Sequence, residues 1–158
     1  MSDKKYEFVP GDEKTIAPGR TVKRIRLLVA IAAFGLPSGS LGGYIESKEC
    51  LSQSGNAWVS GNAWVSGDAR VFGDAQVSGD ARVFGDASIV WVSKVGRDNG
   101  TLTVFTGKDG DLIATRGCFI GTIDEFLAQS EKVHDDRTHL EYRMLIEVAH
   151  SRITRSAS

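Results

Sequence analysis

The sequence has little cysteine, almost no excess charge and no long apolar run. Among its 158 residues only Cys50 and Cys118 are cysteines, and they stand in unrelated surroundings. A disulfide framework or a metal site needs more cysteines or a closer cluster, so neither is expected, and no cofactor is predicted. Without an export signal we expect a cytoplasmic protein with reduced thiols.

The charges nearly cancel, with 19 Lys and Arg against 20 Asp and Glu. This balance gives no electrostatic reason for binding nucleic acid or an anionic membrane. The longest apolar run, Leu27–Leu36, is well short of the roughly 18 residues that a membrane span requires. It lacks the cleavage context of a signal peptide, and we interpret it as a buried strand.

The sequence does contain a six-residue motif that is repeated from Gly55 to Ile89. Each unit carries Gly with Asn or Asp, then Ala, a variable residue, and Val or Ile. Residues two apart on a strand face the same way, so Ala and Val are predicted to point inward together. The Gly-Asn and Gly-Asp pairs are turn formers and predict the corners.

Three such units close a triangle, so about eighteen residues make one coil. The motif resembles that of the hexapeptide-repeat family of left-handed parallel β-helices. In that family a small residue lies four positions after each aliphatic residue, as Ala63 does after Val59. Ile45 and Leu51 are six apart and form an earlier rung, and a two-residue slip before Val59 predicts a loop. So short a stack has open ends that the flanking segments must cover.

The flanks predict further strands and two helices. Before the repeat, Lys5–Val9 and Thr21–Val29 alternate like strands, with turns at Pro10-Gly11 and Pro18-Gly19. After it, three strand-like runs form a β-meander: Ser88–Val95, Thr101–Thr106 and Leu112–Arg116.

Two capping boxes follow, Thr122 with Glu125 and Thr138 with Glu141, and each begins a helix. The apolar stripe expected on the second helix consists of Leu140, Met144, Leu145 and Val148. The predicted fold class is therefore mostly β: a left-handed parallel β-helix of hexapeptide repeats, with an N-terminal β module and a C-terminal β-meander plus two α-helices. The predicted domains are residues 1–40, 41–90 and 91–158.

The order of these parts is similar to a group of small bacteriophage and prophage proteins. The residues that carry the resemblance are Leu41–Ser47, Gly55–Ala87 and Gly117–Leu127. It implies a phage origin and an accessory role directed at host machinery in the host cytoplasm.

Catalytic residues are missing from the repeat. Many hexapeptide proteins are acyltransferases with a catalytic His on a coil, but there is no His between Leu41 and Val95. We therefore predict a protein that is not an enzyme, with a diverged acyltransferase as the enzymatic alternative. Calcium binding by the Asp corners is a weaker hypothesis, because Asn replaces Asp at several corners. DNA mimicry is also a weaker hypothesis, because only four Asp lie along the repeat.

The outward positions of the repeat carry aromatic and Arg side chains, which mark an interface when they cluster. Stacked coils place Trp64 below Arg82 and Phe84, Trp58 below Gln76, and Arg70 on a third wall. Left-handed β-helices of this family assemble as trimers, and such packing alone would explain the aromatic residues. The same arrangement would build clefts in which a ring stacks on a base and a guanidinium binds a phosphate.

The predicted ligand-binding residues are Trp58, Trp64, Arg70, Arg82 and Phe84. The function predicted from these observations is that of a counter-defence inhibitor, acting as a homotrimer, which sequesters a nucleotide signal or blocks a host defence protein. A purely structural trimeric module is the remaining alternative.

Overall fold

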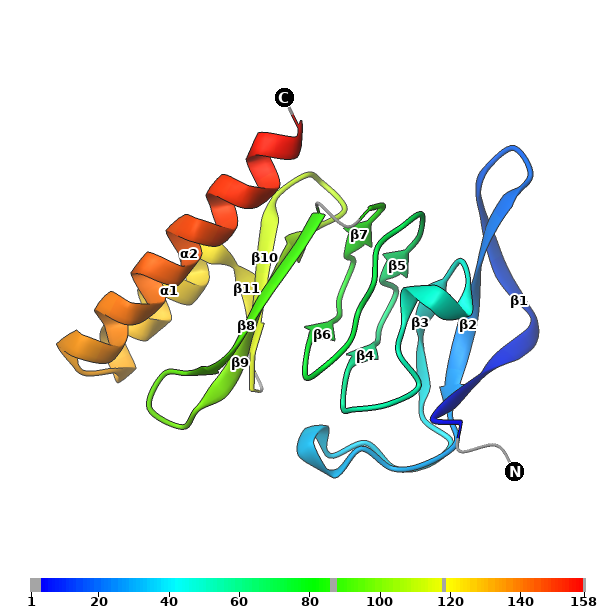
Figure 1. Ribbon diagram of the computed structural model, residues 1–158, viewed down its shortest axis with the longest axis horizontal. Helices are drawn as coiled ribbons and strands as arrows, with labels where there is room; N and C mark the ends of the chain where they lie inside the picture. Colours follow the sequence, from blue (N-terminus) through cyan, green and yellow to red (C-terminus); the bar gives the residue numbers. More distant parts are fainter. Residues whose placement is uncertain (1–3, 86–87, 118, 158) are drawn as a thin grey trace.

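The computed structural model describes residues 4–85, 88–117 and 119–157, so Asp86, Ala87 and Cys118 lie outside the described residues. Its parts follow one another along the long axis of the molecule (Figure 1). A sheet from the N-terminal segment lies at one end, the repeat comes next, and an antiparallel sheet separates the repeat from two helices at the other end.

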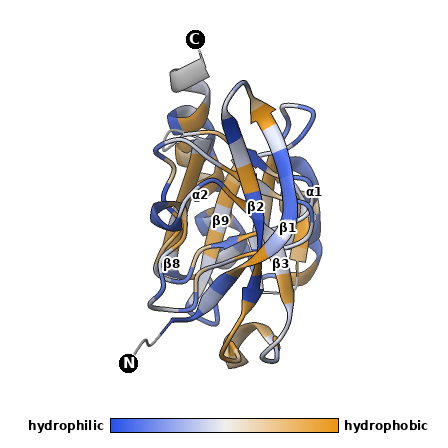
Figure 2. Ribbon diagram, turned by 90° about the vertical axis from the view of Figure 1, so that its right-hand side faces the viewer, coloured by the Kyte–Doolittle hydropathy of each residue, from blue (hydrophilic) through white to orange (hydrophobic). Residues whose placement is uncertain are grey.

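The N-terminal hairpin consists of β1 (Tyr6–Ala17) and β2 (Arg20–Leu27). Hydrophilic and hydrophobic segments alternate along both strands (Figure 2). The turn predicted at Pro18-Gly19 is confirmed, with Gly19 at φ 73°. The turn predicted at Pro10-Gly11 is wrong, because β1 continues through it by a bulge between Phe8 and Glu13. Proline is tolerated there because β1 is an edge strand.

The buried strand predicted over Leu27–Leu36 is also wrong. After β2 the chain bends, Ile31 bridges back to Leu36, and a 3₁₀ turn, η1 (Ala32–Phe34), lies between them. Only Leu27 and Ile31 of this run are buried, while Val29 is 53% exposed. The run folds over one side of the repeat as a loop.

Strand β3 (Leu41–Ile45) joins the hairpin to the repeat. It pairs antiparallel with β2 and parallel with β5 (Trp64–Val65). Its Gly42 is required by close packing, because an added Cβ would lie 2.6 Å from Trp58 Cζ2 and 2.7 Å from the Val59 carbonyl oxygen.

The repeat stacks in parallel at the predicted spacing of eighteen residues. Strand β4 (Trp58–Val59) pairs with β6 (Gln76–Val77), and β5 pairs with β7 (Arg82–Val83). The predicted inward rows are confirmed, because the Ala and Val side chains from Ala57 to Val83 are buried. Parallel pairing also includes the earlier rung, at twenty residues: Ile45 with Val65 and Leu51 with Val71.

The predicted fold class, a left-handed parallel β-helix, is nevertheless wrong. The strands form a mixed sheet of order β1-β2-β3-β5-β7, an antiparallel sheet of order β11-β10-β9-β8 and a parallel β4-β6 pair, and none of these sheets closes. The repeat strands are only two residues long, and in the described residues the third wall is reduced to the Leu51–Val71 bridge. The longer antiparallel strands therefore dominate the architecture. The division at residues 40 and 90 stays a prediction.

The two extra residues between Leu51 and Val59 form the predicted loop, which begins after η2 (Lys48–Cys50). Lys5 anchors this loop, since its Nζ donates 2.6 Å to the Ala57 carbonyl and 3.4 Å to that of Gly55. The Gln53 side chain accepts from the backbone N–H of Lys5 at 2.7 Å. The start of β1 thus closes the N-terminal side of the repeat.

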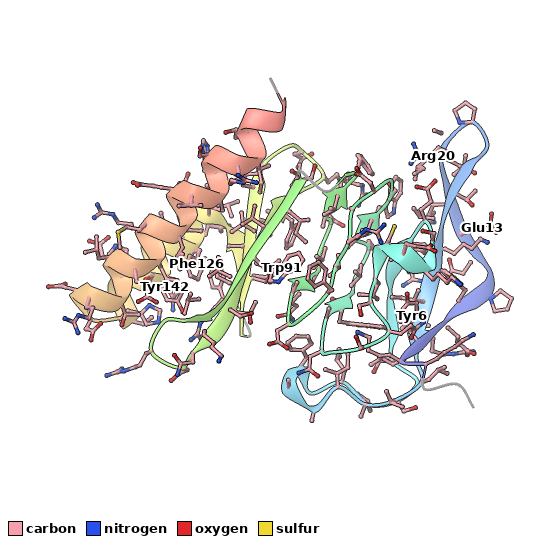
Figure 3. All side chains as sticks on the ribbon, viewed as in Figure 1. Tyr6, Glu13, Arg20, Trp91, Phe126 and Tyr142 are labelled. Atoms are coloured by element: carbon pink, nitrogen blue, oxygen red, sulfur yellow. The ribbon has the colours of Figure 1, made fainter. Side chains whose placement is uncertain are left out.

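The β-meander is confirmed as β8 (Ile89–Val95), β9 (Gly100–Thr106) and β10 (Leu112–Arg116), and β11 (Phe119–Thr122) extends it. Alternation along β9 gives the sheet two buried faces. Phe105 packs with the repeat, while Leu102 and Val104 pack with the helices. Figure 3 shows Trp91 on the repeat side of the sheet and Phe126 on the helix side.

Helix α1 (Ile123–Val133) begins with the predicted capping box of Thr122 and Glu125. The second predicted box is wrong: at the start of α2 (Asp136–Ala157), Asp135 accepts from the N–H of Thr138, and Glu141 accepts from that of Gly96. Of the predicted apolar stripe, only Leu145 packs against the core, where it is partly buried. Helix α2 buries Tyr142, Ile146, Ala149 and Ile153 and leaves Leu140, Met144 and Val148 about half exposed.

Candidate functional site

The central pair of the candidate site is Trp64 on β5 and Arg82 on β7. These residues are direct partners in the parallel ladder, and the Arg82 guanidinium carbon lies 4.0 Å from the centroid of the Trp64 ring. The eighteen-residue register produces this contact, because it places equivalent outward positions next to each other. Sequence reasoning predicted the pair, and the structure brings it together.

The row continues beyond the repeat into the N-terminal sheet. Tyr44 on β3 is the partner of Trp64, and Arg24 on β2 is the partner of Tyr44. The Arg24 guanidinium lies 4.4 Å from the Tyr44 ring centroid. Arg24, Tyr44, Trp64 and Arg82 therefore form a cation–aromatic ladder across four adjacent strands. Sequence reasoning missed its first two members, because Tyr44 pairs at twenty residues and Arg24 pairs antiparallel.

The Arg24 end of the ladder is closed. Asp12 accepts from the Tyr44 hydroxyl at 3.0 Å and from Arg24 Nε at 2.7 Å. The hydrogen bond from Tyr44, aided by Arg24, lowers the pKa of Asp12. Tyr44 is only 3% exposed, so this end offers a ligand no aromatic surface.

The Arg82 end is open and fixed in position. Arg82 Nη1 donates to the carbonyls of Asn62 at 3.0 Å, Ala81 at 2.9 Å and Asp80 at 3.3 Å. These acceptors are neutral, and no carboxylate of the described residues forms an ion pair with Arg82. A cation held over an aromatic ring by backbone groups keeps its charge available for a partner.

Phe84 and Ser66 form the next row beside the central pair. Phe84 is 53% exposed, whereas Ser66 is only 1% exposed. Ser66 Oγ has no hydrogen-bond partner within the described residues. A buried hydroxyl without a partner carries a free-energy cost that a polar ligand or a water molecule would relieve.

Glu46 closes the lower edge of this row. It accepts 2.8 Å from the Gly67 N–H and 2.7 Å from Arg20 Nη2. These hydrogen bonds, that of Arg20 first, lower the pKa of Glu46 to about 2. The carboxylate therefore stays ionised and joins the N-terminal sheet to a corner of the repeat.

Two predicted site residues lie elsewhere. Trp58, predicted to be accessible on an outer wall, is only 1% exposed, and its ring makes an edge contact with Tyr6 at 6.3 Å between centroids. Strands β1 to β3 cover that wall. Arg70 is exposed, but it belongs to the row of the Leu51–Val71 bridge and not to that of Trp64. On Arg70's wall, Phe72 stacks edge-on against Trp91 at 4.6 Å.

The helical end holds a polar cluster at the junction of α1 and α2. Ser130 Oγ lies 2.9 Å from His134 Nδ1 and 3.0 Å from His139 Nδ1. Ser130 is buried, so the two rings satisfy its hydroxyl and fix the junction of the helices. Among the described residues, no group of three or more His, Cys, Asp or Glu side chains is arranged to hold a metal ion.

In the described part of the chain, no helix has the length and apolarity needed to span a membrane. A family model described as the YdcK beta solenoid repeat matches residues 75–89. This stretch contains β6 and β7, and the matched family is a structural repeat, not a class of enzymes. No curated protein and no solved structure matches the chain. The match suggests a relationship to a β-solenoid family.

Proposed function

We propose that this protein is a non-enzymatic binding protein, and that Trp64, Arg82 and Phe84 form its binding surface. The observation that carries the proposal is the guanidinium of Arg82, held 4.0 Å over the Trp64 ring by three carbonyl groups. Because backbone contacts fix the pair, little side-chain entropy is lost when a partner binds.

The chemistry of this surface suits a nucleotide best. The exposed ring of Phe84 and the outer face of the Arg82 guanidinium can stack on a base, and the charge of Arg82 can bind a phosphate. The surface would sequester the nucleotide without converting it.

The resemblance to phage accessory proteins extends this proposal to biology. We propose a counter-defence factor in the host cytoplasm that removes a nucleotide signal, with occlusion of a host defence protein as the second candidate. The exposed Phe84 and Phe72 side chains, at 53% and 52%, also favour self-association, and a homotrimer is our expected assembly.

Isothermal titration with a panel of linear and cyclic ribonucleotides tests the proposal. Trp64→Ala and Arg82→Ala should each weaken binding by about tenfold or more, since stacking on an aromatic residue contributes about 1–3 kcal/mol. Arg70→Ala is the matched control, because Arg70 is exposed on another wall. This variant should bind the nucleotide with the affinity of the wild type.

Native mass spectrometry of the same variants reports the subunit number. If no ribonucleotide binds, or if Arg70→Ala weakens binding as much as Arg82→Ala, the proposed surface is wrong. If Trp64→Ala or Phe84→Ala instead separates the subunits, these side chains pack an interface between copies.

A further inference from the structure

A shallow cleft lies on another side of the molecule, away from the cation–aromatic ladder. It has a volume of about 270 Å³ and is formed by η1, the Asn56 and Asp74 corners of the repeat, the β8–β9 turn and the end of β10. Segments that are far apart in the sequence thus meet around one hollow. Its volume lies just below the range of drug-sized pockets, which fits a small ligand.

Planar polar side chains line this cleft. Asn56, Gln76 and Asn99 each contribute a carboxamide, and Thr101 contributes a hydroxyl. A carboxamide both donates and accepts hydrogen bonds, so the lining matches a ligand whose groups do the same. Phe34 adds an aromatic wall, which supplies apolar contact.

The charges of the cleft disfavour an anionic ligand. Its lining contains two carboxylates, Asp74 and Asp98, and one guanidinium, Arg116. That guanidinium is already occupied, since Arg116 Nη2 lies 3.7 Å from Asp98 Oδ2 and its Nε donates to the Tyr142 hydroxyl at 2.6 Å. A phosphate or carboxylate would therefore face the like charges of Asp74 and Asp98 without a free cation to bind it.

The polar groups are also held in place before any ligand binds. Asn56 Nδ2 donates to Asp74 Oδ1 at 3.4 Å. The backbone of Gln76 is fixed on both sides, by Thr103 at 3.1 Å and Thr115 at 2.7 Å, so its side chain is left for the cleft. Asn99 occupies a left-handed turn position at φ 53°. Such fixed groups lower the entropy cost of binding.

We propose that this cleft binds a neutral saccharide. Ring hydroxyls both donate and accept hydrogen bonds, as the carboxamides require, and the apolar C–H face of a sugar ring packs on an aromatic side chain such as Phe34. A neutral ring also avoids repulsion by the carboxylates of Asp74 and Asp98. This site is separate from the surface of Trp64 and Arg82 and does not depend on it.

Two-dimensional NMR of the ¹⁵N-labelled protein tests the inference with glucose, galactose and N-acetylglucosamine as probes, and uridine and glucose 6-phosphate as comparators. A neutral sugar should shift the amide signals of Asn99, Gly100 and Thr101. The sugar concentration should reach about 10 mM, which saturates a site with a Kd of about 1 mM.

Three variants locate the binding. Asn56→Ala and Asn99→Gly should each weaken it by about fivefold, the equivalent of one hydrogen bond. Asn99→Gly is expected to fold normally, because glycine favours the φ of 53° found there. Asn62→Ala is the matched control, since Asn62 occupies the same corner position outside the cleft and should leave binding unchanged.

The inference fails if none of the three sugars shifts these signals, or if uridine or glucose 6-phosphate binds more tightly than every neutral sugar. It also fails if Asn62→Ala weakens binding as much as Asn56→Ala does.

Discussion

The two ends of the repeat are closed by different physical means. At the N-terminal end, β3 continues the parallel ladder and turns it into an antiparallel sheet, while the ionised groups of Lys5 and Glu46 fix the corners. At the C-terminal end a separate sheet lies across β6, joined to the Gln76 backbone by the hydroxyls of Thr103 and Thr115. A stack of two-residue strands can therefore be ended by extending its sheet or by covering it with another.

This difference has a physical origin. Extending a sheet pairs its open backbone groups directly, but only if the next strand is in register, and Gly42 allows β3 to approach closely enough. Covering it with a second sheet needs no register, but the buried N–H and C=O groups must then find side-chain partners. Four variants separate the two solutions, from the largest expected effect to the smallest.

Gly42→Ala should be the most damaging change. The added Cβ would lie within 3 Å of the Trp58 and Ile25 side chains and of the Val59 carbonyl, which is backbone and cannot move aside cheaply. We expect the free energy of unfolding to fall by about 3 kcal/mol, measured by urea denaturation. The control Gly100→Ala meets its nearest atoms at 3.4 Å and should change little. Equal losses would contradict the close approach of β3.

Thr115→Val breaks the C-terminal closure. It keeps the shape of the side chain but removes the hydroxyl that donates to the Gln76 carbonyl, leaving a buried acceptor without its partner. The expected loss is about 1–3 kcal/mol in the same assay. Thr101→Val removes an exposed hydroxyl that pairs with Ser93 and should have no measurable effect. If Thr115→Val left the free energy of unfolding unchanged, packing alone would be enough to hold the second sheet against the repeat.

Much of this comparison could be foreseen from the sequence. The six-residue repeat predicts the register of eighteen residues, the inward Ala and Val rows and the Trp64–Arg82 pair, because the spacing of a repeat can be read directly from the sequence. The ends do not repeat. No local pattern shows that Pro10-Gly11 lies within a bulged strand, that Trp58 is covered by β1 to β3, or that α2 buries Tyr142 and Ile146 while Met144 stays exposed. These facts depend on what the flanks pack against.

Glu46→Gln tests the N-terminal closure at acidic pH. The pKa of Glu46 is lowered from 4.5 to about 2, so the folded protein binds its proton less readily than the unfolded chain. The stabilisation is full above pH 4.5 and is lost as pH falls toward 2. The wild type should lose stability over this range, and Glu46→Gln should lose less. Because Arg20 is 47% exposed, the difference at neutral pH should be only about 1 kcal/mol or below. Identical acid profiles would exclude this role of Glu46.

Lys5→Met gives the smallest effect, at alkaline pH. Burial lowers the pKa of Lys5 from 10.5 to about 8. Between pH 8 and 10 the unfolded chain therefore holds more protons at this group than the folded protein, and stability should rise with pH. Urea midpoints measured across this window should rise less steeply in Lys5→Met than in the wild type. Thr115→Val, at the uncharged end, should keep the wild-type slope. A wild-type midpoint that is flat or falls would contradict this burial of the ammonium group.

The central claim is that the repeat, closed at both ends, is a rigid platform before any partner binds. Hydrogen–deuterium exchange of the backbone amides that join successive coils tests it most directly. These are the N–H groups of Trp58, Ser60, Trp64 and Ser66, each of which donates to the carbonyl 17 residues further along the chain. We expect these amides to exchange only through global unfolding, as slowly as those of β2 and β9. Exchange as fast as that of the exposed loops, while β2 and β9 remain protected, would show that the repeat opens on its own and that the platform does not exist.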